Sequence, residues 1–150
     1  MASKFTLVPS SIFSEDKARE ILSEVVLLDR EEPLSFLEVP PQSAVLVYAG
    51  DDRPAVYDMP LSLWKIREYN KIAADYRDGC LSLVLSQGEQ LQLCNQYDAP
   101  DFTTALYYLA LAVSRLQINP QQSTVYFMTA PDSENVRLLY NYFKGVEVLR

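Results

Sequence analysis

The pattern of apolar and polar residues is clearest in the middle of the chain, where it predicts three consecutive β-strands. They cover residues 72–76, 80–86 and 90–96, and leucines at alternate positions give the second and third strands one apolar face each. Asp78 and Gly79 make the first turn, and Gly88 lies in the second. The pattern therefore predicts a three-stranded antiparallel unit.

The leucines also predict how the second and third strands pair. Directly opposed residues lie on the same side of a sheet. The leucines of residues 81–85 therefore oppose those of residues 91–93 only when the numbers of paired residues have an even sum. An even sum requires an odd-length loop, most simply three residues with Gly88 in the left-handed conformation. This register places Cys80 directly opposite Cys94.

Helical spacing replaces strand spacing after residue 100. A helix over residues 101–117 opens at Asp98 and Pro100 and ends at Asn119 and Pro120. The residues of its inner stripe are Phe102, Ala105, Leu106, Leu109, Val113 and Leu116.

The remaining C-terminal elements complete an alternation of strands and helices. Residues 124–129 form a strand that is apolar on both faces, which is typical of an interior position. Asp132 caps a second helix, which Lys144 and Gly145 close, and residues 146–149 form the last strand. Parallel pairing with right-handed crossovers is predicted. The inner stripe of the second helix is Val136, Leu139, Tyr142 and Phe143.

The first 69 residues give weaker signals. Residues 4–8 and 44–48 read as short strands, the first of them stopped by Pro9. Ser14 is a suitable N-cap, and the helix after it carries Ala18, Ile21, Leu22 and Val25 at helical spacing. Residues 29–42 carry five charges and three prolines, which predicts a loop or irregular edge. Residues 50–54 predict a turn, and residues 61–68 a short helix.

Composition excludes several classes of chemistry. The chain has no histidine, which excludes a Ser-His-Asp triad, a Cys-His pair and a His-ligated metal. Cys80 and Cys94 alone make no metal site and fit reduced thiols. A net charge of −7 opposes phosphate backbones, so we expect no nucleic-acid partner. No apolar run approaches ~18 residues and no signal peptide is visible, so we expect no membrane partner and a cytoplasmic location.

Several stretches resemble a family of uncharacterised Bacteroidetes proteins catalogued as a domain of unknown function. The resemblance covers nearly the whole chain, although it consists of packing and turn patterns rather than chemistry. The matching stretches are FTLVPSSIF at residues 5–13, GEQLQLCN at 88–95, Asp101-Phe102, LYYL at 106–109, and residues 116–120, 125–128 and 142–144.

That family looks like the actin-like ATPase fold, which is built from two ribonuclease-H-like lobes. The resemblance implies an α/β chain in which residues 69–150 form a complete ribonuclease-H-like lobe, β-β-β-α-β-α-β with a mixed sheet. Residues 1–60 would be a remnant of the first lobe, a partial α/β segment without the opening hairpin of that lobe. No activity is implied, because none is known for the family.

The fold directs attention to the carboxylates near strand ends. An actin-like ATPase holds phosphate with glycine-rich turns that carry an aspartate, and the corresponding stretch contains Asp75, Asp78 and Gly79. A ribonuclease-H-like nuclease would instead gather Asp75, Asp78 and Asp132 around two metal ions. Turns and helix caps also account for these residue types. We therefore expect no catalytic residue, metal or cofactor, and predict that the three carboxylates do not converge.

The helix over residues 101–117 has an unusually apolar outer face. Tyr107 and Leu111 point away from the inner stripe, Tyr108 lies beside them and Arg115 is the charged residue of that side. An ordinary surface helix is more polar. These four residues are the predicted interface, covered either by the N-terminal third of the chain or by a second protomer.

Two classes of function remain after these considerations. The first is a non-catalytic interaction or assembly module, which binds a protein partner or itself. The second is an enzyme, either an actin-like nucleotide-binding ATPase or a ribonuclease-H-like nuclease. The sequence names no small molecule, and the shortage of glycine in the turns, with four glycines in 150 residues, favours the first class.

Overall fold

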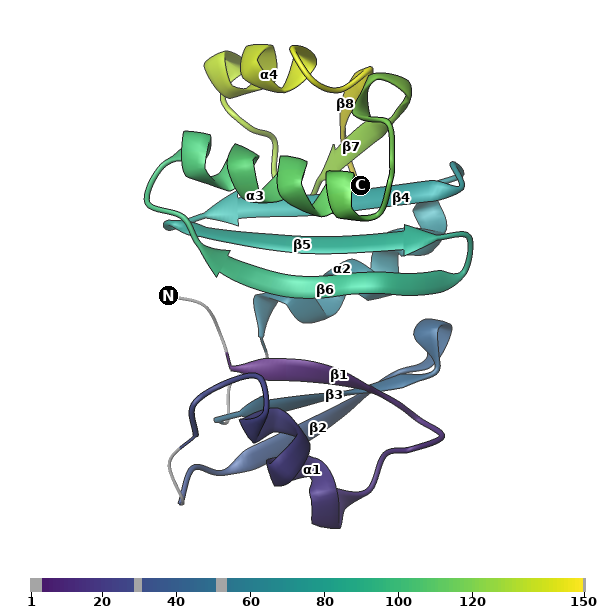
Figure 1. Cartoon of the computed structure of the whole chain (residues 1–150), viewed down its shortest axis with the longest axis vertical. Helices are drawn as coiled ribbons and strands as arrows, with labels where there is room; N and C mark the ends of the chain where they lie inside the picture. The colour runs from purple at the N-terminus through teal and green to yellow at the C-terminus, as the bar shows by residue number, and fades with distance from the viewer. Residues whose placement is uncertain (1–3, 29–30, 51–53, 150) are drawn as a thin grey trace.

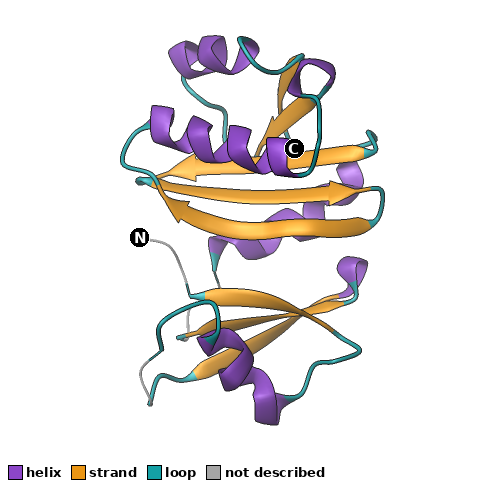
Figure 2. Ribbon diagram, in the orientation of Figure 1, coloured by secondary structure: helices purple, strands orange, loops and turns teal. Residues whose placement is uncertain are grey.

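The computed structural model describes residues 4–28, 31–50 and 54–149, which form two stacked β-sheets with helices outside and between them (Figure 1). The layers follow one another as α3 and α4, a five-stranded sheet, α2, a three-stranded sheet and α1 (Figure 2). The strands and α-helices are β1 (Phe5–Pro9), α1 (Glu15–Ser23), β2 (Leu34–Val39), β3 (Ala44–Ala49), α2 (Asp58–Ser62), β4 (Asn70–Arg77), β5 (Cys80–Gln87), β6 (Gln90–Asp98), α3 (Phe102–Arg115), β7 (Thr124–Phe127), α4 (Ser133–Tyr140) and β8 (Gly145–Val148).

The five-stranded sheet confirms the predicted β-β-β-α-β-α-β unit with a mixed sheet. Its strand order is β6-β5-β4-β7-β8. β4, β5 and β6 pair antiparallel, whereas β7 is parallel to β4 and β8 is parallel to β7. The helices α3 and α4 lie on one face of this sheet (Figure 1). The parallel pairing predicted for the C-terminal strands is therefore confirmed.

The first hairpin turn is the one predicted. Arg77 pairs with Cys80, which leaves Asp78 and Gly79 as a two-residue loop. Both have positive φ, 53° for Asp78 and 71° for Gly79, as the common two-residue hairpin turns with a matching twist require. Aspartate and glycine are among the residues that adopt this conformation at low cost.

The second hairpin differs from its prediction near the turn. Gln87 pairs with Gln90, so the loop has two residues rather than three. The register shifts between Leu85 and Ser86, where the partners change from Leu93 to Leu91 and one residue of β6 has no partner. This bulge restores the even-sum register over the rest of the hairpin, where Leu85 faces Leu93. It also separates the two leucines of β6, because Leu91 packs in the core between the sheets and Leu93 in the core under α3. The prediction that Leu91 and Leu93 share one strand face was therefore wrong.

The predicted opposition of the two cysteines was wrong. Cys80 pairs with Asp98, and Cys94 pairs with Val84. Both thiols are free. In the predicted register, the numbers of two paired residues add up to a value four lower than in the observed register. The difference arises because β5 and β6 are longer than the pattern indicated.

The core between this sheet and its helices uses most of the predicted stripe of α3. Buried members include Leu109 and Val113, while Phe102 and Leu116 pack at the margin. Of the stripe predicted for the second helix, Leu139 and Phe143 are buried, but Tyr142 is 47% exposed, contrary to prediction. α4 ends at Tyr140, too early for Tyr142 to continue the helical stripe.

Gly145 does not close α4 as predicted but begins β8. It pairs with Thr124 of β7, and a Cβ atom at Gly145 would lie 2.7 Å from the Thr124 side-chain oxygen. Real Cβ atoms do not approach other heavy atoms so closely. The glycine is therefore needed for the contact between the two strands, rather than for a left-handed helix end.

The N-terminal layers follow their predictions in part. β1 and β3 are present, but residues 34–39 form a regular strand where a loop or irregular edge was predicted. Pro33 precedes β2 and Pro40 follows it, so the prolines flank the edge strand instead of interrupting it. Residues 51–53 of the predicted turn and residues 29–30 lie outside the described residues.

The helical predictions for this half need two corrections. Ser14 occupies the N-cap position of α1 without a side-chain hydrogen bond, and Val25 lies beyond the helix with 61% of its surface exposed. The predicted helix over residues 61–68 is instead α2 followed by a 3₁₀ turn at Leu63–Lys65. Pro60 lies in the first turn of the short α2, where the backbone N–H that a proline lacks would have no partner within the helix. It therefore does not break the helix as a proline further along would.

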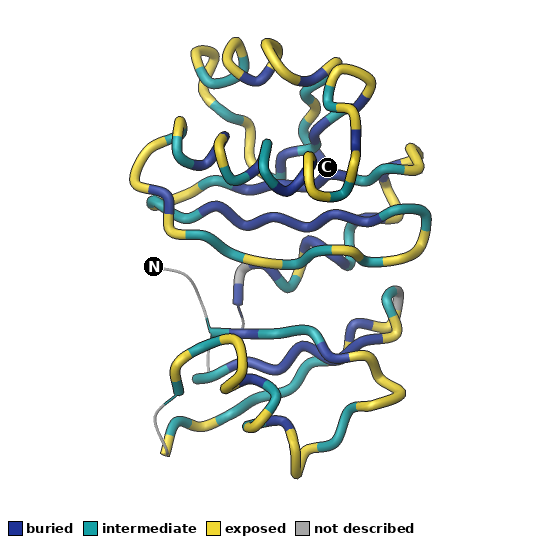
Figure 3. The backbone as a smooth tube through the Cα atoms, viewed as in Figure 1, coloured by how far each residue is buried: buried dark blue, intermediate teal, exposed yellow. Residues whose placement is uncertain are grey.

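A shared core joins the two sheets. One cluster of buried residues includes Met59 and Leu63 around α2, Leu46 of the three-stranded sheet, and Ala73 and Val84 of the five-stranded sheet (Figure 3). The described residues before β4 thus pack on the face of the five-stranded sheet opposite α3. The prediction that the N-terminal third covers the outer face of α3 was wrong.

Candidate functional site

Asp75, the first carboxylate singled out in the sequence, is buried on β4. Only 7% of its surface is exposed, and Arg77 Nε donates to its Oδ2 at 2.8 Å. Oδ1 is fully buried and has no hydrogen-bond partner among the described residues. Its strand face is that of Ala73, which packs in the core shared by the two sheets.

Asp75 belongs to a polar row that crosses three strands. It pairs with Ser82 of β5, which in turn pairs with Gln96 of β6. Gln96 Nε2 donates to Ser82 Oγ at 3.0 Å, so Ser82 and Gln96 satisfy each other. Sequence reasoning missed these two residues, although polar residues at alternate positions of otherwise apolar strands were a visible signal.

A small hollow lies where β4 and β7 end. It has a volume of about 240 Å³, and both Asp78 and Asp132 line it, together with Asn135 of α4. Asp75 does not line it, so the structure brings together two of the three predicted carboxylates. Among the residues that the structure describes, no group of three His, Cys, Asp or Glu side chains could hold a metal ion. This arrangement offers no two-metal nuclease site.

The turn at Gly79 does not fit a nucleotide phosphate. The position of a Gly79 Cβ atom lies 3.6 Å from the carbonyl oxygen of Ala99, and Ala99 N donates to the carbonyl oxygen of Gly79 at 2.8 Å. Tyr76 donates its hydroxyl proton to the same Ala99 oxygen. The glycine therefore lies against a main-chain carbonyl oxygen, which would repel a phosphate on that side of the turn. The adjoining hollow is also smaller than the roughly 300 Å³ of ordinary ligand pockets.

The outer face of α3 lies in a stretch of the chain with very little charge. Between Phe102 and Pro131 the only charged residue is Arg115, and no salt bridge of Arg115 occurs among the described residues. Tyr107 is 63% exposed. Its ring meets that of Tyr108 edge to face at 5.7 Å, so the predicted interface residues form one connected surface.

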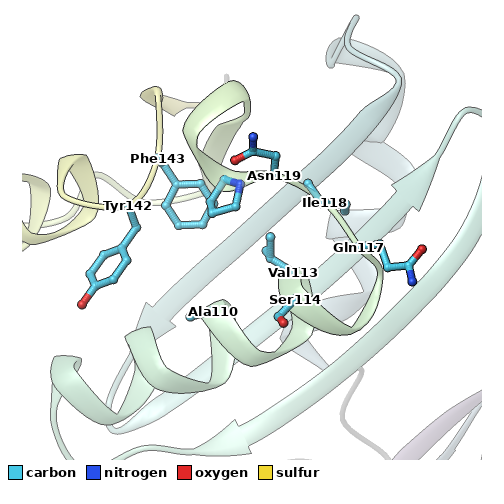
Figure 4. A pocket seen from close by; sticks show the side chains of 9 residues that line it. Ala110, Val113, Ser114, Gln117, Ile118, Asn119, Tyr142 and Phe143 are labelled. Atoms are coloured by element: carbon cyan, nitrogen blue, oxygen red, sulfur yellow. The ribbon is translucent and has the colours of Figure 1, made fainter.

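Two hollows flank α3. The first, of about 460 Å³, lies between α3 and the segment after α4, with Ala110 and Ser114 on one side and Tyr142 and Phe143 on the other (Figure 4). Figure 4 shows the Tyr142 ring extending from that segment toward α3. Small side chains on the helix leave this space open.

The second hollow lies between α3 and β6 and has a volume of about 390 Å³. Leu111 and Arg115 line it from α3, and Leu93 and Tyr97 line it from β6. Tyr97 stacks on Tyr108 with 4.8 Å between ring centroids, which fixes one end of the hollow. Three of the four predicted interface residues, Tyr108, Leu111 and Arg115, therefore line one apolar groove.

The charge of the chain is divided unevenly along its length. Residues 1–98 contain nine basic and sixteen acidic residues, whereas residues 99–150 contain four of each. The excess negative charge thus lies in the N-terminal layers and the antiparallel strands. The helical layer that carries the α3 surface contributes no net charge.

Both thiols are partly buried, and their raised pKa values make them poorly reactive. Burial raises the pKa of Cys94 to about 12 and raises the pKa of Cys80 to a smaller extent, chiefly by the same cause. Because the thiolate is the reactive species, Cys94 should remain unmodified by iodoacetamide at pH 8. Peptide mapping by mass spectrometry should find it alkylated only after unfolding in urea, and rapid alkylation of the folded protein would contradict its burial.

Comparison with known proteins agrees with this architecture. A family model described as "Protein of unknown function (DUF3822)" matches residues 61–146. The chain belongs to this family. A crystal structure from Bacteroides thetaiotaomicron, of a protein with actin-like ATPase fold and unknown function, is similar to it with 14% identity and a TM-score of 0.82. The match covers 97% of this chain and 65% of the other.

The comparison establishes the actin-like fold and the family, as the resemblance in the sequence had implied. The chain spans about 65% of the length of the Bacteroides protein. No curated protein matches it. Within the described residues, no helix has the length and apolar character needed to cross a membrane.

Proposed function

We propose that the protein is a non-catalytic interaction module of the actin-like fold, which binds a partner protein through the outer face of α3. The observation that carries this proposal is the groove between α3 and β6. It combines apolar walls with Arg115, the one charge in a stretch of thirty residues. Such a surface favours a partner that presents apolar side chains and one carboxylate.

The turn between β4 and β5 also supports the proposal, because its contacts disfavour nucleotide binding. Asp75 and Arg77 neutralise each other, and the turn at Gly79 packs against Ala99. Arg77 is thus already paired with a carboxylate, and a carbonyl oxygen lies beside the glycine where a phosphate site needs N–H donors. The residues present therefore do not fit Mg-ATP at this turn, and no catalytic step is assigned to it.

The α3 face is tested by replacing Tyr107 and Leu111 together with serine. Full burial of each side chain contributes roughly 1.5–3 kcal/mol, so the double variant should bind the partner at least tenfold more weakly. The measurement compares the proteins retained by tagged wild type and variant in cells that express the natural protein. The matched control is Trp64→Ser, because Trp64 is also exposed, at 75%, and lies outside α3.

The same experiment has outcomes that contradict the proposal. Equal retention of every bound protein by the double variant and wild type would show that α3 is not the binding surface. A wild-type solution mass of two chains that falls to one in the double variant would replace the foreign partner with a second copy. A rise in thermal stability with Mg-ATP, about 2.7 kcal/mol at 100 times the dissociation constant, would favour the nucleotide-binding alternative.

A further inference from the structure

We propose that the outer edge of β6 binds an extended segment of the partner as an added β-strand, whose side chains alternate between hollows on the two faces of the sheet. This inference rests on the proposed function and specifies its mode of recognition. An added strand would form main-chain hydrogen bonds with the partner, which the α3 surface cannot supply.

The edge itself is the first argument. β6 is the terminal strand of the five-stranded sheet, so about half of its backbone N–H and C=O groups point away from β5. Natural edge strands are usually protected by charges or prolines, but residues 90–97 contain neither. β1 lies beside β6 across two hollows and touches it at few points, and the bulge interrupts the start of the strand. No charge or proline within residues 90–95 would prevent a further strand from pairing there.

The second argument is that hollows lie on both faces beside this edge. On the α3 side, Leu93 and Tyr97 of β6 help to line the groove described above. On the opposite side, Gln90 and Leu91 line a hollow of about 510 Å³ that also contacts β1. Strand addition needs such pockets, because alternate side chains of an added strand point to opposite faces.

A third hollow lies further along β6, on the side of the sheet opposite α3 (the lower side). It has a volume of about 530 Å³, and Cys94 and Asn95 of β6 line it together with Lys4 and Thr6. The lower side is thus more polar than the groove under α3. It suits threonine or glutamine side chains, whereas the upper groove suits valine or leucine.

The charges favour a foreign segment over a second copy of this chain. Arg115 in the upper groove would meet a carboxylate on the same face of the added strand. The β6 residues on that face, Leu93 and Tyr97, supply no carboxylate, so pairing of β6 with β6 would leave Arg115 unpaired. Two copies would also each bring a net charge of −7. A partner segment that pairs with six residues of β6 would extend over about 20 Å.

The probe is a capped, fluorescein-labelled peptide of nine residues, with valine at alternate positions, threonine between them and one valine replaced by glutamate. Two derivatives carry backbone N-methyl groups on alternate residues, one set on the valine-side positions and the other on the threonine positions. Only one set of N–H groups faces the edge of β6. Fluorescence anisotropy should show that one derivative loses at least tenfold in affinity while the other stays within threefold of the parent.

The upper groove is tested by exchanging charges. A peptide with lysine in place of glutamate should bind at least fivefold more weakly to wild type, and Arg115→Glu should reverse this preference. Arg115 is exposed, so the variant should fold, which circular dichroism checks. Equal effects of the two methylated peptides, or no binding of the parent peptide at 1 mM, roughly the weakest affinity that such contacts give, would overturn strand addition.

These outcomes separate the two proposals. Partner binding that depends on Tyr107 and Leu111, together with equal behaviour of the methylated peptides, would keep the α3 surface and remove the added strand. Alternate-residue dependence with no effect of Tyr107→Ser and Leu111→Ser on partner retention would do the reverse. Hydrogen exchange supplies a direct check, since amides of residues 90–95 should be protected when the parent peptide binds.

Discussion

Replacing Met59 with alanine should lower the free energy of unfolding by about 2–5 kcal/mol, the usual cost of truncating a large buried aliphatic side chain. Met59 is 2% exposed and lies in α2 between the two sheets. The cluster to which it belongs contains residues of both sheets. A cavity at Met59 therefore removes packing from the N-terminal and C-terminal layers at once.

Urea unfolding followed by circular dichroism checks this prediction. We expect a single transition in both wild type and Met59→Ala, with a lower midpoint in the variant, because the shared core couples the layers. Leu138→Ala is the control, since Leu138 is 39% exposed and should change stability by no more than about 0.5 kcal/mol. Two separate transitions in wild type would contradict the coupling and favour independent units at residues 1–60 and 69–150.

Replacing Arg77 with alanine should destabilise the fold by about 2 kcal/mol. The change leaves the Asp75 carboxylate buried without its cation, and breaking a buried pair costs about 3–5 kcal/mol when both partners are buried. The Arg77 side chain is 56% exposed, so water screens part of the interaction and the expected loss is smaller. Thermal and urea unfolding of the variant measure the loss.

A second variant shows whether the unpaired charge causes the effect. In Asp75→Ala with Arg77→Ala no carboxylate remains to be desolvated, so the double variant should be more stable than Arg77→Ala alone. Lys65→Ala serves as the matched control for loss of an exposed cation, because Lys65 lies outside this row of polar residues. If Arg77→Ala and the control were equally stable, the ion pair would have no structural role.

The sequence was informative wherever local chemistry and burial agreed. Asp78 and Gly79 occupy a turn that demands positive φ, so local conformation alone identified it. The stripe of α3 was equally clear, because one face of this helix is buried against the five-stranded sheet. The apolar residues of β7 likewise indicated an interior strand, which pairs with β4 and β8. Among the described residues Asp78 and Asp132 line one hollow that Asp75 does not reach, and the prediction that no metal or cofactor binds there stays a prediction.

The errors came from features that depend on distant parts of the chain. β2 is held by its pairing with β3, and its own prolines and charges gave no sign of that partner. The bulge in β6 allows a tight turn while Leu85 still faces Leu93, and it puts Leu91 and Leu93 on opposite faces, an outcome that a uniform register does not include. The layer covered by the described residues before β4 could not be read either, because both faces of the five-stranded sheet carry apolar residues.

Ser82 and Gln96 show the same limit for the polar row. Their alternation with apolar residues was visible in the sequence, but only the register places them beside Asp75. The hollows beside β6 were also invisible in the sequence, since each is lined by elements that are far apart along the chain. Composition had nevertheless marked α3, where Arg115 stands alone among thirty residues.

The uneven division of charge between residues 1–98 and 99–150 has a kinetic consequence. A partner that approaches the α3 side meets a region without net charge, so long-range attraction adds little to the encounter rate. Association there should proceed at the ordinary rate for unsteered proteins, about 10⁵–10⁶ M⁻¹s⁻¹, and vary little with ionic strength. The negative charge of the N-terminal layers repels strongly acidic molecules. The same charge distribution that gives α3 no long-range attraction for a partner therefore also disfavours the approach of polyanions.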